Sequence, residues 1–392
     1  MPRLCGCFDS QASSSTKQGG PASSLVLSST MAILSNLFLL ISLGALSTAF
    51  TLHNETHSDE WTWPKSYIAL GDSYASGVGA GHFFKPYNKQ VKMCKRFDGS
   101  YPSQVKDSLG IQQFDFVACS GNSLDDLSVQ YERLGNKSAE LVTLSISGND
   151  FLFGKAVERC VYNYYLAGSV SPHSDRQRDK KCRKALRESR ALVEGSQRKD
   201  EKSIWTRYEE EVDRIVSTRL STANPNSILI ITGYAKFFAT PKEKSDVCDG
   251  KRFPLYDLKR TKSNLLHKKV RHEMNDLVHQ VNTQIRDRIA SRHPGKITFI
   301  DIDPLFHKHR FCESSPEDQV PGSRTEDSDN VYFNSLISKI QEPKRKLGRS
   351  FIFHPKTQAH KAIAEEIRME VLFRFNAITG TVPSSLTTAG TD

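Results

Sequence analysis

The stretch "YIALGDSYASGVGAG", Tyr67 to Gly81, runs from an apolar segment through Gly71, Asp72 and Ser73 into a turn of small residues. The segment before Gly71 is short, uncharged and apolar at both odd and even positions, which is typical of a parallel strand covered on both faces. A strand that ends on a serine among small residues leaves room for another molecule to approach the hydroxyl. Ser73 is therefore a candidate nucleophile, and the alternative is a helix N-cap, a position that serine favours.

Four more apolar segments have the same character, and segments of helical period separate them. The five predicted strands are Tyr67–Leu70, Phe114–Ala118, Leu141–Ser147, Ser227–Thr232 and Ile297–Ile300. The predicted helices are Tyr101–Leu109, Asp125–Leu134, Lys155–Ala167, Ser203–Ser221, Leu265–Ala290 and Pro355–Phe373. This alternation predicts one α/β domain with three α/β/α layers around a five-stranded parallel sheet. The stretch from Tyr162 to Trp205 has basic residues and no convincing strand, so we interpret it as a helical insertion.

Polar turns follow the first three predicted strands. They contain Gly71-Asp72-Ser73, then Cys119-Ser120-Gly121-Asn122, then Ser147-Gly148-Asn149-Asp150. Ligands of open parallel sheets bind at the carboxyl ends of the strands, so we expect these turns at one edge. Each turn offers backbone N–H groups or a short polar side chain. A serine nucleophile needs such donors, because its attack on an acyl carbon creates an oxyanion.

These three turns, together with "FHPKTQAH" near the C-terminus, resemble the four sequence blocks of the SGNH or GDSL hydrolases. Ser73, Gly121, Asn149 and His354 match the Ser, Gly, Asn and His of those blocks in the family's order, and the similarity spans roughly residues 67–373. Within the family, the sequence is most similar to the secreted, three-disulfide actinobacterial esterase and lipase branch. The segments that carry this similarity include "ACSGNSLDDL", "ISGNDFLFGKAVERC" and "TGYAKFF".

The resemblance implies a flavodoxin-like SGNH-hydrolase fold and a mechanism. Ser73 would be the nucleophile, and His354 would take its proton and later return it to the leaving alkoxide. The backbone N–H groups of Ser73 and Gly121 and the side-chain amide of Asn149 would form an oxyanion hole. The structural alternatives are that Asn149 only forms a turn and that His354 is only a loop residue before the last helix. No cofactor or metal ion is implied, because this chemistry needs only protein groups and water.

The sequence departs from the family pattern at one position. The family usually has an acidic residue three positions before the histidine, and here that position is Phe351. We expect the Phe351 backbone carbonyl to accept a hydrogen bond from the His354 ring, as in some members of this branch. The alternative is an acid from elsewhere, Asp301 or Asp303, at the end of the last predicted strand. A neutral acceptor stabilises the imidazolium less than a carboxylate does, so we expect a working pair with a modestly lowered base pKa.

Six cysteines lie in the body of the chain, after two near its N-terminus. An even number of cysteines without CxxC spacing indicates disulfides in an oxidising compartment. Pairing each cysteine with its sequence neighbour closes one long loop per bridge, and free buried cysteines are the alternative. The predicted bridges are Cys94–Cys119, Cys160–Cys182 and Cys248–Cys312. The branch named above also pairs its cysteines sequentially.

One strongly apolar run, Ala32–Phe50, ends in the small residues Ser47, Thr48 and Ala49. This pattern is typical of a secretory signal peptide and its cleavage site, so we expect an extracellular protein. The run is nearly long enough to span a bilayer, and an uncleaved signal anchor that tethers the protein to a membrane is the alternative.

These features divide the chain into three parts. Residues 1–50 form the N-terminal extension with the signal peptide or anchor, residues 62–375 form the hydrolase domain, and residues 376–392 form a disordered tail. Asn54 and Asn136 lie in Asn-x-Ser/Thr sequences, which are glycosylation acceptors in secreted proteins.

Composition narrows the function further. The 392 residues carry a net charge of +10, and Lys and Arg concentrate between Arg176 and Lys202 and in "EPKRKLGR". Acidic residues are mixed with them and aromatic residues are few, so we interpret both clusters as solvated surface and expect no nucleic-acid partner. The predicted function is a monomeric secreted esterase or lipase that needs no obligate protein partner. Its substrate would be an ester of a lipid, an acylated carbohydrate or a polyester.

The sequence leaves two further questions open. A catalytically silent lipid- or carbohydrate-binding protein of the same fold is the alternative function, and Phe351 at the acid position is its best support. Phe83, Phe84 and Tyr87 could line an acyl or sugar site or form an ordinary hydrophobic patch.

Overall fold

The structure is a computed structural model of the chain. It describes residues 63–161, 165–166, 172–196, 201–239, 248, 261–262, 267–313, 330–335, 340–342 and 350–379. The expected signal segment and Asn54 lie outside these residues, whereas Asn136 lies inside them and is exposed. No helix among the described residues is both long and apolar enough to cross a membrane.

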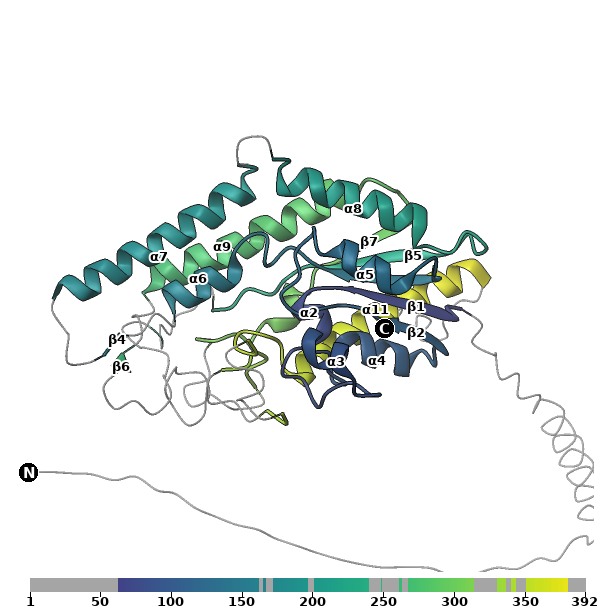
Figure 1. Cartoon of the computed structure of the whole chain (residues 1–392), viewed down its shortest axis with the longest axis horizontal. Coiled ribbons are helices and arrows are strands. Elements are labelled where there is room, and N and C mark those ends of the chain that lie inside the picture. The colour runs from purple at the N-terminus through teal and green to yellow at the C-terminus, as the bar shows by residue number, and fades with distance from the viewer. Residues whose placement is uncertain are drawn as a thin grey trace, which may run out of the picture. The chain divides into compact units, whose positions relative to one another are not determined.

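Five parallel strands form the central sheet, in the order β2-β1-β3-β5-β7 (Figure 1). The strands are β1 (Ser66–Gly71), β2 (Gln113–Phe116), β3 (Leu141–Ser145), β5 (Ile228–Thr232) and β7 (Ile297–Ile300). Nearly all residues of β1, β3 and β5 are buried, as expected for strands covered on both faces. Counting these strands alone, the order is that of flavodoxin-like sheets, whose ligands bind where the chain changes direction between β1 and β3. The predicted fold class is confirmed.

Helices cover both faces of this sheet (Figure 1). On one side lie α4 (Tyr101–Ser108) and α11 (Thr357–Thr379), which pack against each other. On the other side lie α5 (Leu127–Leu134), α8 (Ile204–Thr218) and α9 (Lys268–Gln284). Short helical elements also occur: α2 (Ser73–Ser76), α3 (Lys89–Cys94), η2 (Ile285–Ile289) and η3 (Asp303–Phe306). Helix α11 continues to Thr379, so the first four residues of the predicted tail are helical.

The predicted helical insertion contains one long helix, α7 (Pro172–Val193), which packs against α6 (Phe153–Cys160) and α9. Sequence reasoning found no strand here, but β4 (Tyr165–Leu166) pairs antiparallel with β6 (Thr261–Lys262). Each of these strands has only two residues. Alternating polarity has too little length to become visible in so short a strand.

The three disulfides pair sequential cysteines, as predicted. The bridges are Cys94–Cys119, Cys160–Cys182 and Cys248–Cys312. The first joins the end of α3 to the turn after β2, and the second joins α6 to α7. The first bridge therefore fixes one of the three polar turns at the carboxyl edge of the sheet.

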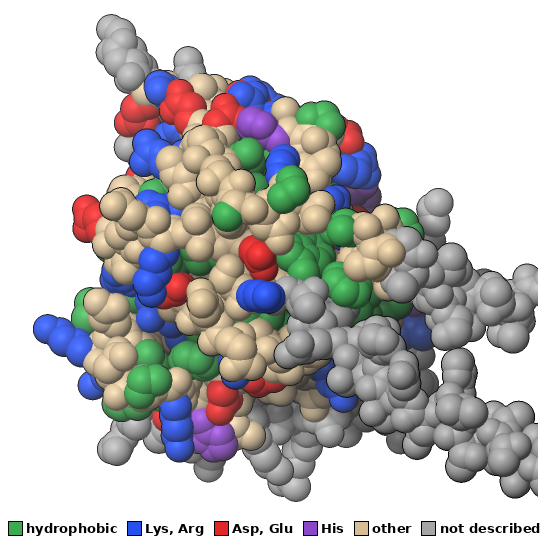
Figure 2. Space-filling view, turned by 90° about the vertical axis from the view of Figure 1, so that its right-hand side faces the viewer, with side chains coloured by type: hydrophobic (Ala, Val, Ile, Leu, Met, Phe, Trp, Pro, Cys, Tyr) green, Lys and Arg blue, Asp and Glu red, His purple; other side chains and the backbone are tan. Residues whose placement is uncertain are grey.

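Lys and Arg lie among Asp and Glu on the face shown in Figure 2. Many basic groups of the described residues are paired, as in the contacts of Arg292 with Asp213 at 2.6 Å and of Arg374 with Glu370 at 2.7 Å. Paired surface charges of this kind contribute little to stability.

Candidate active site

Ser73 is the first residue of α2, directly after β1, at the carboxyl edge of the sheet. The chain turns sharply there because Gly71 has a φ of 134°, and a Cβ on Gly71 would overlap the Ser145 carbonyl oxygen. Asp72 caps α2, since its Oδ1 accepts a hydrogen bond from the Tyr74 N–H at 2.9 Å. Ser73 does not serve as the cap, so its hydroxyl is available for another contact.

That contact is with His354, which precedes α11. His354 Nε2 lies 2.6 Å from Ser73 Oγ, although the two residues are 281 positions apart in the chain. His354 Nδ1 lies 3.1 Å from the Ile352 carbonyl oxygen. A carbonyl can only accept, so Nδ1 carries the proton and Nε2 is left to accept from the serine hydroxyl.

The nearest acceptor for the His354 ring is the Ile352 carbonyl, one residue after the predicted Phe351. The Phe351 carbonyl accepts from the main-chain N–H of His354 at 3.2 Å, and it also acts on the ring by raising its pKa. Phe353, between them, has a left-handed φ of 60°. This turn of the backbone presents the Ile352 carbonyl to the ring.

The alternative acids are engaged elsewhere. The Asp303 carboxylate pairs with Lys236 at 3.0 Å and with Arg310 at 2.9 Å. Asp301 Oδ1 accepts from the Asn282 amide at 3.2 Å. In the described part of the chain, His354 therefore forms no hydrogen bond with a carboxylate.

Burial sets the electrostatics of the histidine. It lowers the pKa of His354 to about 4, and the nearby Lys95 ammonium lowers it further, while the Ile352 and Phe351 carbonyls oppose the shift. Burial disfavours the charged form of an imidazole, which explains the direction. At neutral pH the ring is uncharged and can accept a proton from Ser73.

Gly121 and Asn149 lie on the turns that follow β2 and β3. The Asn149 side chain reaches across to the other turn, where its Nδ2 donates to the Asn122 carbonyl at 2.7 Å. Within the described residues, the main-chain N–H groups of Ser73 and Gly121 donate to no acceptor. The three turns that sequence reasoning singled out thus meet at one edge.

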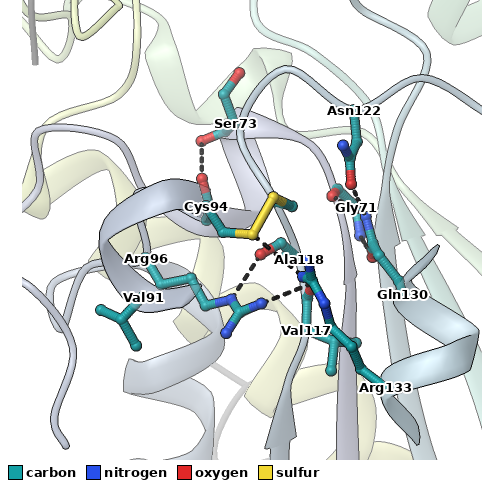
Figure 3. Close-up of a disulfide and its surroundings, with 12 residues drawn as sticks. Gly71, Ser73, Val91, Cys94, Arg96, Val117, Ala118, Asn122, Gln130 and Arg133 are labelled. Carbon is teal, nitrogen blue, oxygen red and sulfur yellow. Dashed lines mark hydrogen bonds between the residues drawn. A yellow bond between two sulfur atoms is a disulfide. The ribbon is translucent and has the colours of Figure 1, made fainter. Parts of the chain in front are cut away.

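Gln130, which sequence reasoning missed, holds two of these turns together (Figure 3). It is fully buried on α5, accepts from the Gly71 N–H at 3.0 Å and donates to the Gly71 carbonyl at 2.8 Å. The same amide nitrogen lies 2.8 Å from Asn122 Oδ1. One side-chain amide thus provides hydrogen-bond partners both for the backbone at the end of β1 and for the turn after β2.

Tyr234, which follows β5, was also missed, and it links the turn after β1 to the turn after β3. Its hydroxyl donates to Asp72 Oδ2 at 2.8 Å and accepts from the Gly148 N–H at 2.8 Å. Burial raises the pKa of Asp72 to about 7, although hydrogen bonds from the Tyr74 N–H and Tyr234 oppose the shift. Tyr234 therefore fixes the turn that carries Asn149 relative to the turn that carries Ser73.

Replacing Tyr234 with phenylalanine is expected to lower kcat on p-nitrophenyl butyrate about tenfold and to reduce stability by about 1–3 kcal/mol, because it leaves two buried polar groups unpaired. KM should change much less than kcat, since the effect is on the position of reacting groups. Steady-state kinetics and urea unfolding measure both effects. Tyr87→Phe, at an exposed tyrosine, is the matched control. An unchanged kcat in folded Tyr234→Phe would show that the hydroxyl does not position the turns.

A cavity of about 240 Å³ opens beside Ser73 and His354. Its apolar wall consists of Phe153, Val157, Phe237, Ile352 and Phe353. The aromatic residues considered from sequence lie elsewhere, with Phe83 stacked on Phe97 and Phe84 packed against Phe116.

The molecule is an α/β protein whose flavodoxin-like sheet brings a serine and a histidine into contact at its carboxyl edge. The GDSL-like lipase/acylhydrolase family matches residues 69–362 of this sequence, and the chain belongs to that family. It is an enzyme of the lipase and esterase class.

Relatives and solved structures agree with this membership. Lipase 1 of Streptomyces coelicolor is 28% identical over 251 residues, which is 64% of this chain and 74% of the relative. A lipase of Streptomyces rimosus is 25% identical over 250 residues, with the same coverage. The extracellular lipase of S. rimosus has a TM-score of 0.51 at 21% identity, and phospholipase A1 of Streptomyces albidoflavus has 0.52 at 22%. Each comparison covers 78% of this chain and 99% of the solved one, and they show the shared fold.

Proposed function

We propose that this protein is a secreted carboxylic ester hydrolase in which Ser73 and His354 form the catalytic pair. The observation that carries the proposal is the 2.6 Å contact between Ser73 Oγ and His354 Nε2. Ser73 Oγ attacks the acyl carbon while His354 takes its proton. The bond to the alcohol oxygen then breaks, and His354 returns the proton to the leaving alkoxide. Water, deprotonated by His354, releases the acid from the acyl-serine.

The oxyanion of each tetrahedral intermediate would be held by the N–H groups of Ser73 and Gly121 and by the Asn149 amide. Two observations support this assignment: neither N–H group donates to an acceptor within the described residues, and Asn149 reaches the turn of Gly121. Donors that are already in position cost no reorganisation when charge develops.

The histidine would work without a carboxylate partner. The Ile352 carbonyl holds the Nδ1 proton and so selects the tautomer that leaves Nε2 basic. A neutral carbonyl stabilises the imidazolium less than a carboxylate does. The pKa of His354 is lowered chiefly by burial, and the Ile352 carbonyl offsets that shift only in part.

Turnover of p-nitrophenyl butyrate together with labelling by a p-nitrophenyl phosphonate tests the proposal. We expect ester hydrolysis that stops when one phosphonate per chain is attached, with mass spectrometry locating the adduct on Ser73. Binding of the ester without hydrolysis would favour the catalytically silent alternative. An adduct on another serine with complete inactivation would contradict the assignment of Ser73.

Secretion is part of the proposal. It is supported by the apolar run at Ala32–Phe50, by the three disulfides and by the relative described as extracellular. Sequencing the N-terminus of the protein from culture medium tests it. A start near Phe50 is expected, and retention of the intact run in a membrane fraction would favour the anchored alternative.

A further inference from the structure

A half-buried lysine lies beside the proposed catalytic pair. Lys95 follows α3, and its Nζ donates to Ser350 Oγ at 2.7 Å. Ser350 lines the same cavity as Ser73 and His354. The Lys95 ammonium is also close enough to His354 for its charge to disfavour the imidazolium. The lysine thus stands on the histidine side of the cavity.

The backbone around Lys95 is fixed. The preceding residue, Cys94, is bridged to Cys119, and its carbonyl accepts from the Ser120 N–H at 2.9 Å. The following residue, Arg96, is buried, and its guanidinium donates to the Ala118 carbonyl at 2.8 Å (Figure 3). Both contacts tie this segment to the turn after β2. The position of Lys95 relative to that turn is therefore built into the fold.

The charge of Lys95 has no counter-ion within the described residues, where Ser350 is its hydrogen-bond partner. Two other shielded cations near the sheet edge do have one, since Lys236 pairs with Asp303 and Arg310 with Glu313. Shielding a cation from water without a counter-charge is unfavourable. A bound anion at this place would supply the missing charge.

The chemistry assigns the two sides of the cavity to the two halves of an ester. The apolar wall, with Phe153 and Val157, suits the acyl chain. His354 must reach the leaving oxygen, so the alcohol half lies on the histidine side, where Lys95 stands. Glu158, a carboxylate of the lining, belongs to α6 together with Phe153 and Val157.

We propose that Lys95 and Ser350 form a subsite for an anionic phosphate group on the alcohol half of the substrate. The inference rests on the proposed function and adds a substrate class to it: esters whose alcohol is a glycerol phosphate or a similar phosphorylated alcohol. A lysine binds phosphate as a point charge, and a serine hydroxyl beside it donates a hydrogen bond to a phosphate oxygen.

Two esters that differ by one group test the subsite: glycerol monobutyrate and the same monobutyrate carrying a 3-phosphate. We expect wild type to have a kcat/KM about tenfold higher for the phosphorylated ester, because charge-assisted contacts are stronger than neutral ones. Lys95→Gln should bring the ratio close to one, and Lys95→Arg should keep most of it. Lys92→Gln, at an exposed lysine of α3, should leave the ratio unchanged. The preference should shrink at about 0.5 M salt, where screening is strong.

Inhibition by inorganic phosphate shows whether the subsite also binds free phosphate, apart from a phosphorylated substrate. Competitive inhibition of monobutyrate hydrolysis by phosphate, weakened in Lys95→Gln, supports the subsite even if the phosphorylated ester is a modest substrate. Equal ratios in wild type and Lys95→Gln, with no phosphate inhibition, overturn it while ester hydrolysis at Ser73 stands. Failure of wild type to hydrolyse either ester, or p-nitrophenyl butyrate, would instead contradict the proposed function.

Discussion

Ser73→Ala is expected to lower kcat on p-nitrophenyl butyrate by a factor on the order of 10⁶, because no acyl-enzyme can form without the hydroxyl. The residual rate over water would come from the donors at Gly121 and Asn149, which the substitution leaves in place. KM should change little, since the oxygen contributes to the reaction and not to the apolar wall that binds the acyl chain. Active-site titration of the Ser73→Ala preparation detects contaminating esterase, which would otherwise be read as residual activity of the variant.

The same variant should fold normally. Ser73 is only half-buried, and Asp72 rather than Ser73 caps α2. We therefore expect the free energy of unfolding to stay within about 0.5 kcal/mol of wild type. Ser108→Ala, at an exposed serine of α4, serves as the matched substitution that keeps full activity. Activity of Ser73→Ala above one-hundredth of wild type would remove Ser73 from the mechanism.

The strands could be predicted because their physical signal is local. β1, β3, β5 and β7 begin and end within two residues of the predicted bounds. In β1, β3 and β5 the signal is clear because residues covered on both faces are mostly apolar. The strand β2 ends at Phe116, before the predicted Ala118. The N–H groups of Val117 and Ala118 both donate to the Ala69 carbonyl there, so regular pairing stops. Nothing in the apolar pattern marks that irregularity.

The supporting residues of the site were harder to predict. Gln130 lies in a helical segment, where a glutamine ordinarily faces water, and its burial depends on how α5 packs on β1. Tyr234 did carry a signal, because it follows the fourth predicted strand at the same edge as the three polar turns. Ligands of open parallel sheets bind at the carboxyl ends of the strands, and the same rule applied to the fourth predicted strand places Tyr234 in the site.

The nearest acceptor of the His354 ring lies one residue after the predicted Phe351 for a reason of backbone geometry. Which carbonyl faces the ring depends on the left-handed φ of Phe353. A bulky residue rarely adopts that conformation, and no glycine marks the position. The sequence blocks could place His354 near Ser73, but they carry no information on the direction of the peptide groups between Phe351 and His354.

The second large effect is expected for His354→Ala, which should lower kcat/KM by about 10⁴ to 10⁶. Ser73 would then have to lose its proton to water, and the alkoxide would leave without a proton donor. Because a general base is missing, the remaining rate should rise with pH, as hydroxide takes over the role. His82→Ala, at an exposed histidine, is the matched control and should keep full activity.

The pH profile of wild type gives a second test of the same residue. His354 acts as a base only when uncharged, and burial lowers its pKa from 6.5 to about 4. The free-enzyme profile of kcat/KM should therefore stay level as pH falls past 6.5 and drop only on passing through about 4. Asp72, with a pKa raised to about 7, titrates earlier but lies outside the proton path, so Asp72→Asn should leave the acidic limb in place. An acidic limb near 6.5 in wild type would mean that the histidine is solvated in the free enzyme, and a limb that persists unchanged in His354→Ala would assign it to another group.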